Sequence, residues 1–237
     1  MHDQGRRSSR AAAVAARAGE ILDRDGLLRN PYLTALSAGT MSREAFRLTQ
    51  EQFFFAVTFF PRPMAALVGR IEDPAARLDI LHNLVEEHGE FDPRAFHHNT
   101  FQEFLSRLGS DVSSLQGTSV WPELRAFNSV LIAACVLDEL EVGVGCMGII
   151  EHAFAGISAA IGQAVVDRGW LTEDRLVHYR LHAEIDIRHS EEFYAVVEPL
   201  WSDEARRYYI VQGLELGAYA FRRLYTDLSE RARGMAD

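Results

Sequence analysis

The sequence contains no lysine, since all 24 of its basic residues are arginine. Chemistry that needs a lysine amine is therefore excluded, including Schiff bases, a pyridoxal anchor and the lysine of a phosphate-binding loop. The sequence also lacks a Gly-x-Gly-x-x-Gly segment after a strand pattern and a Gly-x-Ser-x-Gly turn. The usual signatures of dinucleotide-binding and hydrolase folds are thus missing.

Cysteine is almost as scarce, with Cys135 and Cys146 as the two thiols among 237 residues. Two cysteines cannot build a disulfide framework and suit a reducing compartment, so we expect a cytoplasmic location. The net charge of −10, with no dense basic cluster beyond Arg6 and Arg7, argues against a nucleic-acid partner. We expect no apolar run to reach the roughly 18 residues of a membrane span, which predicts a soluble protein.

Apolar residues recur with a helical period almost throughout the chain, and strand-like alternation is not found. A hydrophobic share of 48% is enough for one large core. The arginine- and alanine-rich start has no apolar segment of the kind found in signal peptides. We therefore predict a flexible tail over residues 1–9 and a single all-α domain over residues 10–237.

Capping residues and helix breakers divide this domain. Ser42 is expected to cap a long helix that Pro61 and Pro63 interrupt, and Asp73 with Pro74 opens the next one. Three glycines between 143 and 148 permit close packing or a kink. The helices are expected near 10–25, after 31, from 42, from 73 to 87, 94–108, 122–167 as one or two, 172–201, and from Ser202 to 231.

Three polar residues, His182, Asp186 and His189, are spaced i, i+4 and i+7 in a helix-forming stretch. At roughly 100° per residue they fall within a sector of about 60° and form one stripe. Leu181, Ile185 and Phe193 mix with this stripe, so we expect it to face inward. A buried Asp–His hydrogen-bond ladder in a helical core is one interpretation, and a metal site is the other.

Two further clusters favour the metal site. Glu151 lies in the most hydrophobic segment of the chain, where a glutamate is seldom buried without an ion pair or a metal, so we expect it to approach the stripe. Its neighbour His152 points about 100° away. The stretch from Asn83 to His98 is rich in carboxylates and histidines, although alone it could be a solvated helix end.

Together these motifs resemble the haem-oxygenase-like diiron oxidases, whose helical fold is shared with TenA-type thiaminases and with the cofactor-synthesis oxidase PqqC. The resemblance runs from about Phe53 to Phe193. It implies a single bundle of about seven to eight helices with two irons. The pattern that carries it consists of Glu87-x-Gly89, His97, Glu151 and His182-x-x-x-Asp186-x-x-His189.

The resemblance implies that six residues hold the metal ions, namely Glu87, His97, Glu151, His182, Asp186 and His189. Glu90 competes with Glu87 as the first carboxylate, because it lies two turns from His97 if the helix continues through Pro93. Mixed nitrogen and oxygen donors suit Fe(II) or Mn better than a closed structural zinc site. His182 and His189 are roughly 10 Å apart along the axis, which favours two metals with Asp186 between them.

We therefore expect a non-haem diiron enzyme that activates O2. An apolar surround from Phe53, Phe54, Phe101 and Phe154 would exclude water from the reaction. The expected partners are a small-molecule substrate and an external electron donor, and a homodimer is an open alternative. The favoured reaction is N-oxygenation of a nitrogen-containing metabolite, with oxidative C–C cleavage or decarboxylation of a fatty or amino acid as the alternative.

Other function classes remain open at this point. Arg180 and Arg188 could hold a substrate carboxylate or form surface ion pairs. A metal-free TenA-type hydrolase would use Cys135 as its nucleophile, although a core cysteine is the more frequent explanation. Against a PqqC-like cofactor-free oxidase stand the three carboxylates Glu87, Glu151 and Asp186. A non-catalytic binding protein is a further class, and the intact set of candidate metal ligands argues against it.

Overall fold

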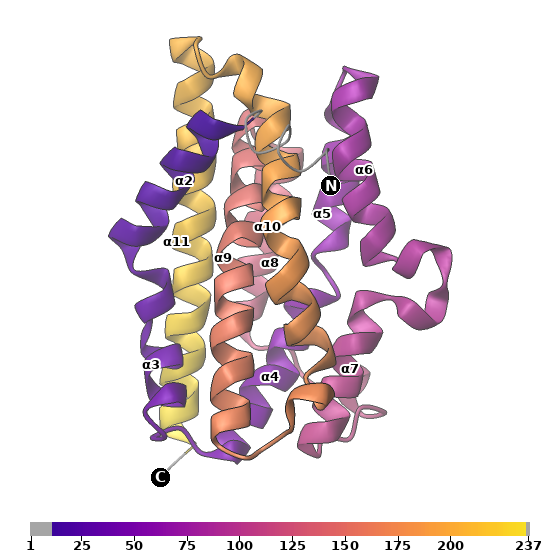
Figure 1. Cartoon of the computed structure of the whole chain (residues 1–237), viewed down its shortest axis with the longest axis vertical. Helices are drawn as coiled ribbons and strands as arrows, with labels where there is room; N and C mark the ends of the chain where they lie inside the picture. Colours follow the sequence, from indigo (N-terminus) through magenta and orange to yellow (C-terminus); the bar gives the residue numbers. More distant parts are fainter. Residues whose placement is uncertain (1–10, 236–237) are drawn as a thin grey trace.

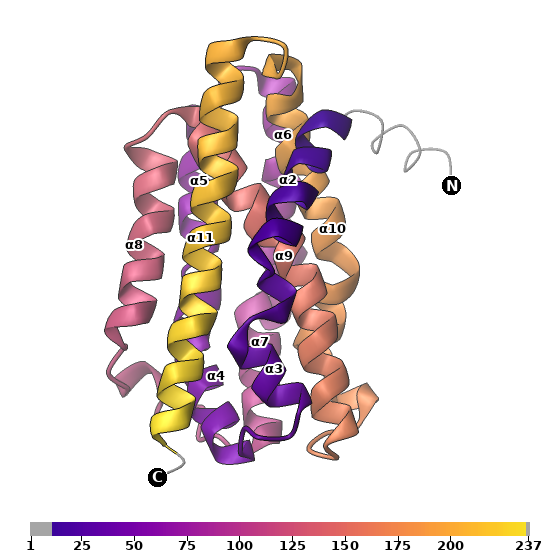
Figure 2. The same cartoon turned by 90° about the vertical axis from the view of Figure 1, so that its left-hand side faces the viewer.

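The computed structural model describes residues 11–235, and the tail expected over residues 1–9 lies outside them. Within the described residues the chain forms α-helices and short 3₁₀ turns, and no residue belongs to a strand. Most helices run along the long axis of the molecule, as Figures 1 and 2 show. The prediction of an all-α protein is confirmed.

The first half of the chain follows the expected caps and breaks, except that the helix expected from 94 begins at His97, after the 3₁₀ turn Pro93–Ala95. Ser42 accepts a hydrogen bond from the amide of Ala45, and Asp73 accepts one from the amide of Ala75. Pro61 begins a new helix, as expected of a residue that has no amide hydrogen to donate. The helices are α2 (Ala12–Asp25), α3 (Pro31–Ser37), α4 (Arg43–Val57), α5 (Pro61–Arg70), α6 (Pro74–Glu87) and α7 (His97–Leu108).

The second half contains the longest helices, and two of their starts differ from expectation. The helix expected from Thr172 begins at Val177, because Glu173–Arg175 forms a separate 3₁₀ turn. The last helix is capped by Asp203 rather than Ser202, since Asp203 accepts hydrogen bonds from two amides of the first turn. The helices are α8 (Pro122–Val136), α9 (Leu140–Asp167), α10 (Val177–Val197) and α11 (Glu204–Gly234).

Helix α9 is the centre of the bundle and packs along α10 and α11. Glycines make the approach to α11 possible, because a Cβ atom on Gly213 would lie 2.3 Å from the carbonyl oxygen of Val142. A Cβ atom on Gly145 would lie 2.8 Å from the carbonyl oxygen of Ile210. The sequence-based expectation of close packing by the glycines of α9 is therefore confirmed.

Helix α9 also corrects an expectation about membranes. By length and composition it could cross a membrane, since its most apolar 18-residue window has a mean hydropathy of 1.5. The expectation that no segment reaches this length is therefore wrong for α9. However, 78% of that window is buried inside the fold, which is typical of a core helix.

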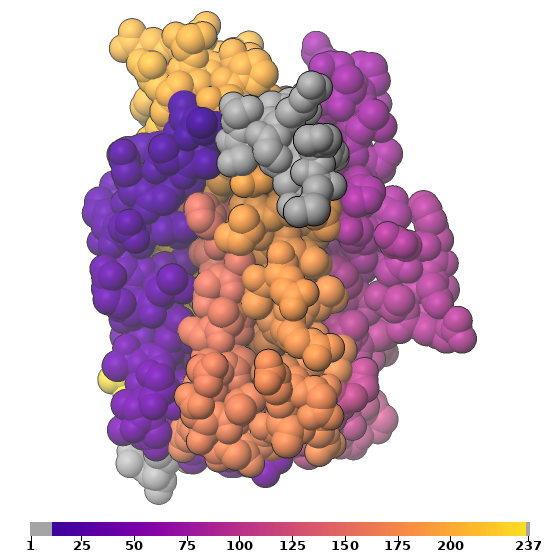
Figure 3. Space-filling model, in the orientation of Figure 1, coloured from indigo at the N-terminus to yellow at the C-terminus, as the bar shows by residue number. Residues whose placement is uncertain are grey.

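Helix α10 lies next to the elements that supply the other polar clusters. It packs against α9, α6 and α7. On the face drawn in Figure 3, the atoms of α10 lie between those of α2 and those of α6. The opposite side of α10 is turned into the bundle, and His182, Asp186 and His189 are all buried there.

Candidate metal centre

The first group of donors joins three helices at one level of the bundle. Glu87 is the last residue of α6, His97 is the first residue of α7, and His182 lies on α10. Each offers one donor atom, and these atoms lie within 4.8 Å of one another. His97 Nδ1 is 2.8 Å from Glu87 Oε1, and the rings of His97 and His182 meet edge to face at 4.9 Å. All three side chains are buried.

The second group consists of Glu151 on α9 with Asp186 and His189 on α10. Their donor atoms also lie within 4.8 Å of one another. His189 Nδ1 is 3.9 Å from Glu151 Oε2 and 3.7 Å from Asp186 Oδ1. The other oxygen of Glu151 accepts a long hydrogen bond of 3.4 Å from Asn83 Nδ2. The groups are linked because His182 Nδ1 is 2.8 Å from Asp186 Oδ1.

Within residues 11–235, three buried atoms of these groups have no hydrogen-bond partner: His182 Nε2, Asp186 Oδ2 and His189 Nδ1. A hydrogen-bond ladder inside the core would leave few such atoms, because a buried polar atom without a partner is unfavourable. Nitrogen and carboxylate oxygen are the donors that iron and manganese accept in proteins. The residues therefore fit a metal centre better than a ladder.

The carboxylates repel one another without a cation between them. Burial raises the pKa of Glu151 well above its usual range, and the charges of Asp186 and Glu87 raise it further. Burial together with the charge of Glu87 likewise raises the pKa of Asp186 well above its usual range. For Glu87, burial alone would raise the pKa, but the charge and hydrogen bond of His97 lower it.

Glu90 lies apart from both groups. Its side chain is exposed, and α6 ends at Glu87 instead of continuing through Pro93. Gly89, Glu90 and Phe91 all have positive φ angles, which turns the chain sharply between α6 and α7. The helical continuation that made Glu90 a competitor of Glu87 is therefore wrong, and Glu87 is the carboxylate beside His97.

Sequence reasoning gave no role to Glu86, which supports the second group from outside. His189 Nε2 lies 2.8 Å from Glu86 Oε2, and Arg188 Nη2 donates to both oxygens of Glu86 at 2.8 Å. Burial would raise the pKa of Glu86, but the hydrogen bonds from His189 and Arg188 lower it to about 2. Glu86 is therefore an anion that orients the ring of His189.

The arginines considered as substrate ligands have other surroundings. Arg188 is paired with Glu86 and with Glu192, and Arg180 is exposed. Neither residue lines the cavity beside the donor groups. Arg188 therefore forms ion pairs, as one of the two alternatives expected, but they are partly buried beside the second donor group and not on the open surface.

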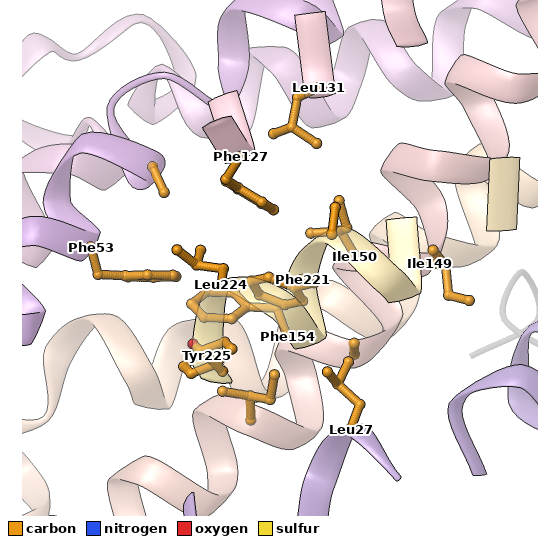
Figure 4. Close-up of a cluster of buried hydrophobic side chains, with 14 of the residues drawn as sticks. Leu27, Phe53, Phe127, Leu131, Ile149, Ile150, Phe154, Phe221, Leu224 and Tyr225 are labelled. Carbon is orange, nitrogen blue, oxygen red and sulfur yellow. The ribbon is translucent and has the colours of Figure 1, made fainter. Parts of the chain in front are cut away.

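This cavity is small and largely apolar. The cavity has a volume of about 50 Å³, enough for a few water molecules. Of the four phenylalanines expected around the site, Phe53 and Phe154 line it. Phe101 packs against Phe53, and Phe54 stacks on Phe101, so neither of these two lines the cavity. Figure 4 shows some of the apolar wall, namely Phe53, Phe127, Ile150, Phe154 and Phe221.

His178 lines the cavity and is a second residue, after Glu86, to which sequence reasoning gave no role. It lies one turn before His182 and is fully buried. Burial lowers its pKa well below the usual range, and the nearby His182 and His97 lower it further. The i, i+4 spacing of His178 and His182 is the signal that could have identified it.

Cys135 is placed for packing. It is fully buried on α8 and does not line the cavity. Burial raises the pKa of its thiol far above the usual range. Because the thiolate is the nucleophile, this environment does not activate Cys135.

Comparison with known proteins agrees with the geometry. The model of the family described as iron-containing redox enzymes matches residues 47–221, a range that includes all six donor residues. The chain belongs to this family of iron-containing redox enzymes. Family membership establishes an enzyme whose chemistry is redox and whose cofactor is iron.

Relatives of this redox enzyme are distant in sequence. A 4-aminobenzoate synthase from Nitrosomonas europaea is 27% identical over 183 residues, which are 73% of each chain. A 4-chloro-allylglycine synthase from Streptantibioticus cattleyicolor is 21% identical over 188 residues, 79% of this chain and 71% of that one. A domain of unknown function with a haem-oxygenase-like fold, solved from Shewanella denitrificans, has a TM-score of 0.74 at 16% identity and covers 95% of this chain and 93% of its own. The expected haem-oxygenase-like fold is confirmed.

Proposed function

We propose that this enzyme is a non-haem diiron oxidase or oxygenase that uses O2 to oxidise a small metabolite. The observation that carries the proposal is the pair of adjoining donor groups, each with three donor atoms within 4.8 Å of one another. Mixed nitrogen and oxygen donors suit Fe(II), and Mn is the alternative metal. The residues that would hold the two ions are Glu87, His97, Glu151, His182, Asp186 and His189.

When bound, two ferrous ions would supply electrons for the reduction of O2. The protein's own contribution is charge and exclusion of water. Glu87, Glu151 and Asp186 offset the positive charge of the ions and so favour their higher oxidation state. The phenylalanine wall keeps water away from the reacting atoms.

The best-supported substrate class is a small nitrogen-containing metabolite that undergoes N-oxygenation. One oxygen atom of O2 would enter the substrate and the other would leave as water, with two protons and two electrons. Those electrons require an external donor. The names of the relatives, 4-aminobenzoate synthase and 4-chloro-allylglycine synthase, refer to nitrogen-containing products. Oxidative C–C cleavage at the same site is the second candidate reaction.

We also propose a cytoplasmic location and a free small molecule as the partner of this enzyme. The buried free thiols of Cys135 and Cys146 suit a reducing compartment, which favours the cytoplasm. The acidic chain is expected to work on a free small molecule rather than on nucleic acid or at a membrane. A homodimer is compatible with this function, because the cavity is built from one chain.

The test is anaerobic loading with Fe(II), metal analysis, and then a pulse of O2 followed by optical absorption and an oxygen electrode. We expect about two irons per chain, rapid oxygen consumption and a transient absorption change. The matched variant is Asp186→Ala, which should lose iron and oxygen consumption while it keeps its helical circular dichroism.

Two results would overturn the proposal. The first is a parent protein that takes up no iron under these conditions. The second is an Asp186→Ala variant that still consumes O2 at the parent rate. Cys135→Ala is the control for the hydrolase alternative, and it should keep full oxygen consumption because Cys135 lies outside the cavity.

A further inference from the structure

His178 lies in the wall of the cavity among mostly apolar neighbours. Its ring is 4.7 Å from Phe101, 5.5 Å from Tyr179 and 4.2 Å from His182, measured between ring centroids. The side chain is fully buried, although none of the metal-donor groups includes it. A polar ring at this position therefore needs an explanation of its own.

The hydrogen bonds of Thr100 fix which ring nitrogen of His178 carries the proton. The hydroxyl of Thr100 donates its one hydrogen to the carbonyl oxygen of His97, over 2.7 Å. The same hydroxyl oxygen lies 3.0 Å from His178 Nδ1 and can therefore only accept there. Nδ1 of His178 is thus the protonated nitrogen, and Nε2 of the neutral ring keeps its lone pair.

Nε2 of His178 is buried and has no hydrogen-bond partner among the described residues. Nδ1 is turned toward Thr100 of α7, and His178 is one of the residues that line the cavity, so Nε2 is the nitrogen left to bind a ligand there. The other polar residues of the lining, Glu87, Glu151 and His182, belong to the metal-donor groups. The rest of the lining, which includes Phe53 and Phe154, is apolar and offers no donor. A buried acceptor without a partner is unfavourable, so a ligand with an N–H or O–H group is stabilised at this position.

We propose that His178 determines substrate specificity: its Nε2 accepts a hydrogen bond from an amine or hydroxyl group of a small, mainly apolar substrate. This inference rests on the proposed function only in taking the cavity as the substrate site. It narrows the substrate class, because a donor group is selected and a bare hydrocarbon is not. A site that hydrogen-bonds its substrate discriminates strongly against analogues that lack the donor.

The experiment compares pyrrole and furan, two five-membered rings of nearly equal size of which pyrrole has an N–H donor. Binding to metal-free protein is measured by ligand-detected NMR titration. The parent should prefer pyrrole over furan by about fivefold to tenfold, the contribution of one hydrogen bond. In His178→Phe this ratio should fall, since the apolar ring cannot accept the hydrogen bond, while Glu87, Glu151 and His182 of the lining are unchanged.

A second pair of variants tests the proton position and does not depend on the folding of His178→Phe. Thr100→Val removes the acceptor for Nδ1, frees the ring to take either proton arrangement, and should lower the ratio. Thr100→Ser keeps the hydroxyl and should keep the parent ratio. A parent without a preference for pyrrole, or a Thr100→Val variant with the full preference, would overturn the inference.

Iron content separates this role from metal ligation. His178→Phe should bind as much iron as the parent, whereas a loss of iron would make His178 a ligand and refute the specificity role. The pyrrole and furan titrations use protein without metal. They therefore decide this inference even if the parent takes up no iron and the proposed function fails.

Discussion

His189 donates from Nε2 to Oε2 of Glu86 over 2.8 Å. This contact fixes the proton on Nε2, since Glu86 is an anion held by Arg188. The lone pair of His189 is therefore on Nδ1, which faces Glu151 and Asp186 and has no other partner. Histidines that bind metals are commonly oriented in this way, by a carboxylate on the opposite ring nitrogen.

The first prediction follows from this contact. Glu86→Gln replaces the anion with a neutral amide, a weaker acceptor for the N–H of His189, and should lower metal affinity by about 10- to 100-fold. Titration with Mn(II), followed by electron paramagnetic resonance, measures the affinity. Glu90→Gln is the matched control because Glu90 is exposed and four residues along, and it should bind like the parent. Equal affinity for both variants would contradict the orienting role of Glu86.

The second prediction separates the two candidate carboxylates beside His97. Glu87→Gln should reduce the iron content of the protein, because Glu87 is buried within the first donor group. Glu90→Gln should retain about two irons per chain, since its side chain points into solvent. Metal analysis after identical anaerobic loading compares them. The reverse pattern would make Glu90 the ligand and require a different turn between α6 and α7.

The stripe on α10 could be predicted from sequence because it depends on one helix alone. Spacings of four and seven residues put His182, Asp186 and His189 on one side of any regular helix. The involvement of Glu151 could also be predicted, because it lies in the most apolar helix of the fold, where a charged residue requires a polar partner. In the structure all four side chains are buried, and Glu151 approaches the stripe as expected, with its Oε2 3.9 Å from His189 Nδ1.

Other features depend on how separate segments meet, and periodicity does not describe that. The turn after α6 contains Glu90 and Phe91 in left-handed conformations, which side chains other than glycine rarely adopt. Glu86 is oriented about 100° from Glu87 on α6, and only the position of α10 shows that both contact the site. The position of the ring proton of His178 likewise depends on Thr100, which is 78 residues away in sequence.

The third prediction concerns the contact between α9 and α11. A Cβ atom on Gly213 would lie 2.3 Å from the backbone oxygen of Val142, so Gly213→Ala must push the two helices apart. We expect a loss of about 1–3 kcal/mol of unfolding free energy, measured by urea denaturation. Gly19→Ala is the control, because a Cβ atom there meets nothing within 4 Å. It should stabilise α2 by up to about 1 kcal/mol, the difference in helix propensity.

The last prediction concerns the repulsion among the carboxylates. It should make Asp186→Asn more stable than the parent without metal and less stable than the parent with metal. The pKa of Asp186 is raised by burial and by the charge of Glu87, so the metal-free folded state holds a proton that the unfolded state has lost. That stability is fully present below the ordinary aspartate pKa and is lost as the pH rises toward the raised value. Asp186→Asn has no carboxyl group at this position to titrate, so its stability does not fall with pH in this way.

Without metal, Asp186→Asn should therefore unfold at a higher temperature than the parent at pH 7, and the difference should shrink toward pH 5. Each pH unit over which only the folded state is protonated costs the parent up to about 1.4 kcal/mol. With saturating Mn(II) the order should reverse, because the parent binds metal more tightly and bound metal stabilises the folded state. Thermal unfolding at both pH values, with chelator and with Mn(II), measures all four cases. An Asn variant that is less stable than the parent without metal at pH 7 would show that Asp186 stabilises the fold through its hydrogen bond to His182 instead.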